Sequence, residues 1–207
     1  MKTTFARGAW DTNALTYAYS YRFPETPEFH QADDHVENAI DPNQRHGWDF
    51  VSLLTREKYG YGTRVTTNLS FAGDGAPIIT WTGSLDTDAE GNRRYGDYFE
   101  VVVWKNGVNV WRLKRDPSVL KEGGVSWVLL LSAEFSLEQE LRHTLTVDIL
   151  ACRMIINVDD KHIFKLYSDD LPASFHAGIN ACEGLCKFYD LSVEADAEPM
   201  KELRTDW

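Results

Sequence analysis

The sequence has few cysteines and no segment typical of export. Its 207 residues include three cysteines, Cys152, Cys182 and Cys186. This odd number, at these spacings, fits neither a disulfide framework nor a complete metal site. The first residues, Met1 to Arg7, lack the apolar stretch of a secretory signal. We therefore expect buried, reduced thiols and a cytoplasmic rather than a secreted protein.

Long apolar runs and an excess of positive charge are also lacking. The longest strongly apolar run, Val125 to Leu131, is too short to span a bilayer. Thirty-two acidic residues against 21 basic ones give a formal net charge of −11. This balance argues against nucleic acid and anionic membrane surfaces as partners, because both bind through Lys and Arg. With 43% hydrophobic residues, the chain can still build a core.

Apolar and polar residues alternate along most of the chain, and this pattern predicts β-strands separated by turns. The predicted strands are Leu15 to Phe23, Asp49 to Thr55, Gly62 to Phe71, Ala76 to Thr82, Tyr98 to Trp104, Val108 to Lys114, Ser126 to Ser132, Thr144 to Leu150, Met154 to Val158, His162 to Tyr167, Phe175 to Ala181 and Leu185 to Val193. Only Ser136 to Arg142, with a capping-box pattern, predicts a short helix. We therefore expect an all-β, antiparallel two-sheet β-sandwich of about 11–13 strands with very little helix.

No linker rich in Pro, Gly or Ser divides the chain, so we expect one domain over residues 1–207. Residues 24–46 are acidic and contain two early prolines. They predict a long polar loop that crosses between sheets or covers one face as a lid. Residues 194–207 predict a peripheral charged tail ending in Trp207.

The segment Lys105-Asn106-Gly107-Val108 is the strongest local motif, because Asn-Gly favours a two-residue type I′ turn. Such a turn places Trp104 opposite Asn109 and Val102 opposite Trp111. The alternation then sorts the side chains onto two faces. The predicted core face holds Phe99, Val101, Val103, Val108 and Val110. The other face holds Tyr98, Glu100, Trp104, Asn109, Trp111 and Arg115, with Val102 and Leu113 between them.

This second face has the composition of a carbohydrate-binding surface. Flat aromatic rings can stack on the C–H face of a pyranose, while carboxylate and amide groups bind its hydroxyls. Trp81 is added to this candidate surface, whereas Trp127, with the apolar neighbours Leu129 and Leu131, is expected in the core. The alternatives are that another sheet or the acidic loop covers this face, or that it forms an oligomer interface.

The last third of the chain carries a succession of strands with a recognisable pattern. Its segments are His143 to Val147, Met154 to Lys161 with Val158-Asp159 before a tight turn, Phe164 to Asp169, Phe175 to Ile179 and Gly184 to Val193. Over about sixty residues this succession resembles the concanavalin A-like lectin/glucanase superfamily, and within it bacterial jelly-roll proteins associated with polysaccharide degradation. The resemblance implies two antiparallel sheets with a concave face that binds an oligo- or polysaccharide.

Glycosidases of that superfamily carry a Glu-x-Asp-x-x-Glu strand, which this sequence lacks. The nearest segment is Asp97-Tyr98-Phe99-Glu100, whose two acids fall on opposite faces of a strand. Glu100 is therefore the candidate catalytic residue of a glycoside hydrolase, which needs a second carboxylate. The candidates for that partner are Asp33, Asp34, Glu37, Asp49 and Glu134. A polysaccharide-lyase alternative would draw on His46, Tyr59, Tyr61, Arg64 and Arg112.

One acidic loop has the outline of a calcium site. Asp86, Asp88 and Glu90 occupy its first, third and fifth positions, Gly91 the sixth, and Asp97 the twelfth. Flanking helices are missing, and the adjacent Arg93 and Arg94 would repel a cation. A solvated hairpin turn is favoured, with calcium as the minor alternative, and we expect no cofactor.

Overall fold

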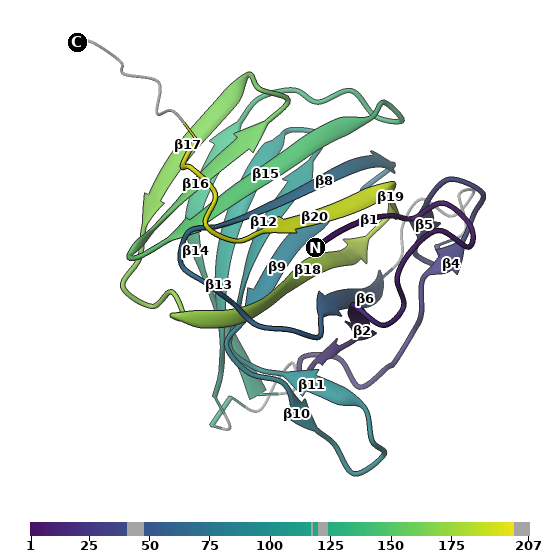
Figure 1. Cartoon of the computed structure of the whole chain (residues 1–207), viewed down its shortest axis with the longest axis vertical. Helices are drawn as coiled ribbons and strands as arrows, with labels where there is room; N and C mark the ends of the chain where they lie inside the picture. Colours follow the sequence, from purple (N-terminus) through teal and green to yellow (C-terminus); the bar gives the residue numbers. More distant parts are fainter. Residues whose placement is uncertain (41–47, 117, 120–123, 201–207) are drawn as a thin grey trace.

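The computed structural model describes residues 1–40, 48–116, 118–119 and 124–200. These residues form strands and no α-helix. The strands make two large sheets that lie one over the other, and a small third sheet projects beside them (Figure 1). All strand pairs are antiparallel except β11 (Arg93–Tyr95) with β3 (Tyr19–Ser20). The predicted all-β, two-sheet sandwich is confirmed.

One large sheet has nine strands. They are β1 (Lys2–Thr4), β4 (His30–Gln31), β5 (Val36–Glu37), β8 (Thr63–Ala72), β15 (His143–Leu150), β16 (Arg153–Val158), β17 (His162–Tyr167), β19 (Leu185–Phe188) and β20 (Asp190–Glu194). The main path runs β17-β16-β15-β8-β19-β5-β4, while β20 pairs with β8 and β1 pairs with β20. The edges of this sheet are therefore β17 on one side and the short strands β4 and β1 on the other.

The second large sheet has eight strands. They are β2 (Leu15–Tyr17), β6 (Trp48–Thr55), β7 (Tyr59–Gly60), β9 (Ile78–Thr82), β12 (Tyr98–Trp104), β13 (Gly107–Arg115), β14 (Val125–Glu134) and β18 (Ser174–Glu183). The order is β14-β13-β12-β9-β18-β6-β2, with β7 on β18. The third sheet joins β3 to the hairpin of β10 (Asp86–Thr87) and β11, which projects at the bottom of Figure 1.

The main core lies between the two large sheets. Val65 and Leu145 enter it from the nine-stranded sheet, and Val101 and Ile179 enter it from the eight-stranded sheet. The predicted core face is confirmed in full, because this cluster contains Phe99, Val101, Val103, Val108 and Val110. Burying one face of each strand in this way fixes which residues remain on the outside of the eight-stranded sheet.

The hairpin of β12 and β13 has a different register from the predicted one. Trp104 pairs with Gly107, so Lys105 and Asn106 form the turn, and neither has a positive φ. Gly107 instead lies in the β13–β14 ladder, where an added Cβ would be 2.0 Å from the Ala133 carbonyl oxygen. Gly107 is thus needed because β13 and β14 lie too close together there for a side chain, and not because it forms a type I′ turn. The register differs by two residues, so the assignment of side chains to faces is unchanged.

Two further predictions about local structure need correction. Ser136–Arg142 is not helical; the Gln139 side chain accepts a hydrogen bond from the Gly73 N–H, and Glu140 has a φ of 66°. The strands number 20 in the described residues rather than about 11–13, because several are only two or three residues long. Of the three free cysteines, Cys182 and Cys186 are buried as expected, but Cys152 is exposed.

The polar loop predicted over residues 24–46 contains short strands where it is described. β4 and β5 lie within it, and β5 pairs with β19, so this stretch extends the edge of the nine-stranded sheet. Residues 41–46 of the loop, including His46, and residues 201–207 of the tail, including Trp207, lie outside the described residues.

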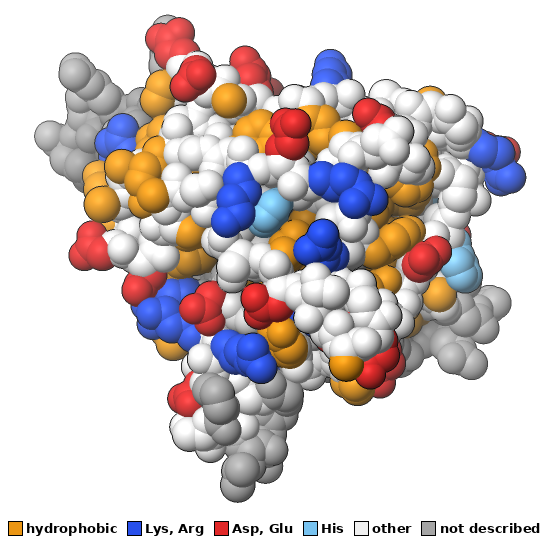
Figure 2. All heavy atoms as spheres, turned by 60° about the horizontal axis from the view of Figure 1, so that its bottom comes forward, with side chains coloured by type: hydrophobic (Ala, Val, Ile, Leu, Met, Phe, Trp, Pro, Cys, Tyr) orange, Lys and Arg blue, Asp and Glu red, His pale blue; other side chains and the backbone are white. Residues whose placement is uncertain are grey.

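Two features of the described residues bear on possible membrane and nucleic-acid contacts. No helix in the described ranges is long and apolar enough to cross a membrane. Figure 2 shows acidic and basic side chains interspersed, with hydrophobic ones between them. Such mixing differs from the continuous basic patch of a nucleic-acid interface.

Candidate functional site

The outer face of the eight-stranded sheet, which points away from the nine-stranded sheet, is divided into a covered half and an open half. In the covered half, Tyr98 joins a second apolar cluster with Tyr95, and Tyr21 and Phe23 pack against it. These covering residues belong to β11 and to the segment that follows β3. The remaining half of the face is open and forms a pocket.

This pocket has a volume of about 450 Å³ and collects three indoles. Trp104, Trp111 and Trp127 come from the adjacent strands β12, β13 and β14. Alternation along each strand turns all three toward the outside of the sheet. The floor between them is formed by apolar side chains, and its residues are Ile78, Val102, Leu113 and Cys182. The volume lies in the range of small-molecule sites.

Polar groups line the same pocket, and two of them are unpaired. The indole N–H of Trp104 and the amide oxygen of Asn109 are buried without a hydrogen-bond partner among the described residues. Buried polar groups in proteins normally have partners, so an unpaired donor and acceptor in one pocket are unusual. Charged side chains also line the pocket, and they are Arg22, Asp74, Glu100, Lys105 and Glu183.

Glu100 lies in the pocket with only 5% of its surface exposed. Its Oε1 accepts a hydrogen bond of 3.2 Å from Asn180 Nδ2 on β18, and the Oδ1 of Asn180 has no partner in the described part of the chain. Burial raises the pKa of the Glu100 carboxyl from 4.5 to about 7, and the Arg22 guanidinium opposes this rise only in part. Glu100 is therefore a carboxyl group that changes charge near neutral pH.

The structure thus brings together four of the predicted site residues and separates the other three. Glu100, Trp104, Asn109 and Trp111 line one pocket. Tyr98 lies in the covered half, where its hydroxyl accepts a hydrogen bond of 2.9 Å from Ser20 Oγ. Arg115 stacks over the Tyr21 ring at 3.9 Å.

Trp81 has to be removed from the predicted surface. It points to the opposite side of the sheet, is fully buried, and stacks on Phe99 with ring centroids 5.4 Å apart. Its strand β9 lies in the middle of the sheet and is buried on both faces. Alternation alone therefore did not show which face of β9 carries the indole.

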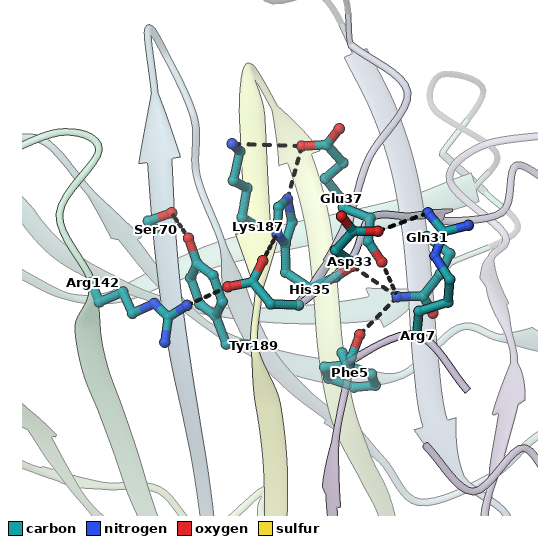
Figure 3. A network of polar contacts seen from close by, with 12 residues as sticks. Phe5, Arg7, Gln31, Asp33, His35, Glu37, Ser70, Arg142, Lys187 and Tyr189 are labelled. Carbon is teal, nitrogen blue, oxygen red and sulfur yellow. Dashed lines mark hydrogen bonds and ion pairs between the residues drawn. The ribbon is translucent and has the colours of Figure 1, made fainter. Parts of the chain in front are cut away.

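The acids proposed as partners of Glu100 lie elsewhere. Figure 3 shows Asp33, His35 and Glu37 in a polar network that ties the N-terminal segment and β5 to β19 and β8. In this network His35 Nδ1 lies 2.7 Å from Asp34 Oδ1, and His35 Nε2 lies 3.2 Å from Glu37 Oε2. Asp49 accepts a hydrogen bond from the Ala39 N–H, and neither it nor Glu134 lines the pocket.

Two carboxylates that the sequence did not single out line the pocket instead. Asp74 follows β8, and Glu183 ends β18; both line the pocket with Glu100. Burial, and then the negative charge of Asp74, raise the pKa of Glu183. No sequence motif predicted these two residues, because the turn after β8 and the bulge in β18 bring them to the pocket.

Trp127 and Arg22 are further pocket residues that sequence reasoning missed. Trp127 is 42% exposed, and the Arg22 guanidinium lies 4.8 Å from the centre of its ring. The prediction that Trp127 lies in the core is wrong because Trp127 pairs with Leu113 on the pocket side of the edge strand β14. Arg22 comes from the N-terminal part of the chain, far from this hairpin in sequence.

The residues proposed for a lyase do not meet in this pocket. The Arg64 guanidinium donates to both carboxylate oxygens of Asp148 on the nine-stranded sheet, and Arg112 pairs with Asp170. Neither these arginines nor Tyr59 and Tyr61 line the pocket.

The acids of the calcium-like loop already have protein donors. Asp88 accepts hydrogen bonds from the Arg94 guanidinium and from the N–H groups of Glu90 and Asn92, and the Arg94 bond lowers the pKa of Asp88. Asp86 accepts from Tyr21 and Asp97 from the Arg115 N–H. These contacts are typical of a hairpin turn, and no group of three or more His, Cys, Asp or Glu in the described residues could hold a metal ion.

No family model matches the chain, and no curated protein sequence does so either. Solved structures do match it in fold. A protein of unknown function with a galectin-like fold from Bacillus subtilis has a TM-score of 0.64 at 9% identity, with 94% of each chain covered. The carbohydrate-binding module CBM66 from Bacillus subtilis has a TM-score of 0.60 at 12% identity, with 88% of this chain and 96% of that chain covered.

A glycoside hydrolase family 16 endo-glucanase from Bacteroides ovatus also matches, with a TM-score of 0.52 at 12% identity over 94% of this chain and 99% of that one. At such identities the likeness establishes the fold and not the activity. The chain therefore has the concanavalin A-like jelly-roll fold that its last third predicts.

Proposed function

We propose that the protein binds an oligo- or polysaccharide in the pocket on the outer face of its eight-stranded sheet. The observation that carries this proposal is the convergence of Trp104, Trp111 and Trp127 on one pocket that also contains unpaired polar atoms. An indole offers a flat apolar face to the C–H groups of a sugar ring. The surrounding amide and carboxyl groups offer partners for its hydroxyls.

The unpaired atoms fit hydroxyl groups better than an apolar ligand. The Trp104 N–H can only donate a hydrogen bond, and the Asn109 amide oxygen can only accept one. A hydroxyl can do both, so a row of sugar hydroxyls can satisfy both atoms. A purely apolar ligand would leave them unpaired, at a cost of about 1–3 kcal/mol for each group.

The structural neighbours support this proposal without deciding it. One is named a carbohydrate-binding module, another a legume lectin-like domain and a third a glycoside hydrolase. These names cover both binding and cleavage of carbohydrates. They therefore agree with a carbohydrate ligand and leave open whether the ligand is only bound.

Glycan cleavage is the second candidate function, and Glu100 favours it. A carboxyl with a pKa of about 7 can act as a general acid at neutral pH. The usual glycosidase mechanisms need a second carboxylate, and Glu183 and Asp74 line the same pocket. In this alternative Glu100 would protonate the leaving oxygen, while Glu183 or Asp74 would act as nucleophile or as base toward water.

Binding can be tested on a glycan array, followed by calorimetry with the best ligand. We expect Trp104→Ala and Trp111→Ala to weaken binding at least about 30-fold, since truncating an aromatic anchor typically costs about 2 kcal/mol or more. Trp10→Ala is the matched control, because Trp10 lies outside the pocket and packs against Phe5. Unchanged affinity in both pocket variants would refute the proposal.

Glu100→Gln separates binding from cleavage. In a binding module the variant keeps its glycan affinity within a few-fold, and neither protein releases shorter products. In an enzyme the variant keeps binding but loses turnover of the oligosaccharide. If Trp104→Ala instead changes the mass in light scattering, the aromatic face is an oligomer interface and the carbohydrate proposal fails.

A further inference from the structure

Strand β14 is an edge strand with an unusual apolar surface. Among the described residues it pairs only with β13, so its other side offers unpaired backbone N–H and C=O groups. Trp127, Val128 and Leu129 are consecutive and are 42%, 46% and 44% exposed. The strand has ten residues, and its only charged residue is Glu134, at its end.

The other edges of the two large sheets carry features that discourage pairing. β1 and β2 have three residues each, and β4 and β7 have two each, which is too short to act as templates. β17 is longer, but it carries Lys165. Short strands and lysines are two common ways in which proteins protect sheet edges. β14 has neither, nor a proline; its pairing with β13 contains one bulge, between Leu129 and Leu131, and it is the longest edge strand of the described structure.

We propose that β14 pairs with β14 of a second copy of this chain, antiparallel and across a two-fold axis near Leu129. Antiparallel pairing of the same strand gives each backbone group a partner and buries the exposed apolar side chains of both copies. The two eight-stranded sheets would then form one continuous sheet. The inference is independent of any glycan ligand, although it would place the two pockets side by side with Trp127 near the junction.

Charge favours a second copy at this edge over contact elsewhere on the surface. The chain carries a net charge of −11, so two copies repel each other over most of their surfaces. Residues 125–133 contain no charged side chain, so this edge lets two copies meet without placing like charges opposite each other. A single strand pair is at the small end of interface sizes, so we expect a dimer that depends on concentration.

Sedimentation velocity over a concentration series tests the proposal. We expect the wild-type chain to shift from monomer to dimer below about 1 mM, and both Val128→Lys and Leu129→Lys to weaken the dimer about tenfold or more. These two side chains lie on opposite faces of β14 and outside the pocket lining. Tyr167→Lys is the matched control, because Tyr167 is 65% exposed on the edge strand β17.

Each outcome has a definite meaning. A wild-type dimer that both β14 variants weaken, and that Tyr167→Lys leaves unchanged, supports the proposal. A wild-type monomer up to about 1 mM overturns it, and so does a dimer that neither β14 variant weakens. Melting curves confirm that the variants are folded. Glycan affinity measured on monomeric Val128→Lys keeps this result separate from the success or failure of the proposed carbohydrate site.

Discussion

The buried carboxyl of Glu100 predicts a pH-dependent loss of stability that one substitution should remove. It accepts a hydrogen bond from Asn180, and burial raises its pKa from 4.5 to about 7. Glu100→Gln keeps the shape of the side chain and a carbonyl oxygen that can accept the Asn180 bond. It cannot ionise, so the comparison isolates the free-energy cost of the buried charge.

The sign and size of the effect follow from proton linkage. Below about pH 4.5 Glu100 is protonated in both the folded and the unfolded chain, so it adds no pH dependence. Between about pH 4.5 and 7 the folded chain holds a proton that the unfolded chain has lost, so stability falls as the pH rises. Since each pKa unit corresponds to 1.36 kcal/mol, the rise from 4.5 to about 7 amounts to about 3 kcal/mol.

The assay is urea unfolding of wild type and Glu100→Gln at a series of pH values between about 4.5 and 8. We expect the variant to gain about 3 kcal/mol relative to wild type across this range, with most of the gain below about pH 7. Glu57→Gln, at an exposed position, controls for the loss of one negative charge. A constant difference between Glu100→Gln and wild type at every pH would refute the reasoning.

Two further predictions concern packing. In Gly178→Ala the new Cβ would lie 1.9 Å from the Leu53 carbonyl oxygen on the neighbouring strand, and this backbone atom cannot move aside cheaply. We expect the variant to lose about 3 kcal/mol or more of unfolding free energy and to melt about 6–12 °C lower than wild type. A variant that melts at the wild-type temperature would contradict this strand geometry. Trp81→Ala should cost about 3–5 kcal/mol in urea unfolding, because Trp81 is fully buried against Phe99. Trp111→Ala should cost clearly less, because its indole borders the open pocket; equal losses would contradict these placements.

The sequence predicted the strands well because their alternation is a local signal. Each predicted run overlaps at least one observed strand, and Tyr98–Trp104 and His162–Tyr167 have the predicted bounds. The assignment of the hairpin residues to two faces also held. The register did not, because Gly107 is needed for close approach to Ala133 on β14, a contact that local turn preferences do not contain.

The candidate site was only half predictable because its limits depend on contacts far apart in the sequence. Alternation placed Glu100, Trp104, Asn109 and Trp111 on one face, and these four line the pocket. Whether that face is open depends on β3, β11 and the segment after β3, which cover Tyr98 and leave the indoles beside an open pocket. The exposure of Trp127 depends on strand order, which makes β14 an edge.

The pocket and the β14 edge differ in the kind of partner that can bind their unpaired polar groups. At the pocket, the Trp104 N–H and the Asn109 oxygen are unpaired among the described residues, and the buried Glu100 accepts a hydrogen bond from Asn180. Unpaired polar groups that line a pocket are candidates for hydrogen bonds with a ligand. Hydroxyl groups can pair with all of these atoms, whereas an apolar surface can pair with none.

At β14 the unpaired groups belong to the backbone and the side chains are apolar, so another strand suits that edge and a sugar does not. The two surfaces should therefore respond independently: substitutions in the pocket should change glycan affinity, and substitutions at Val128 should change mass.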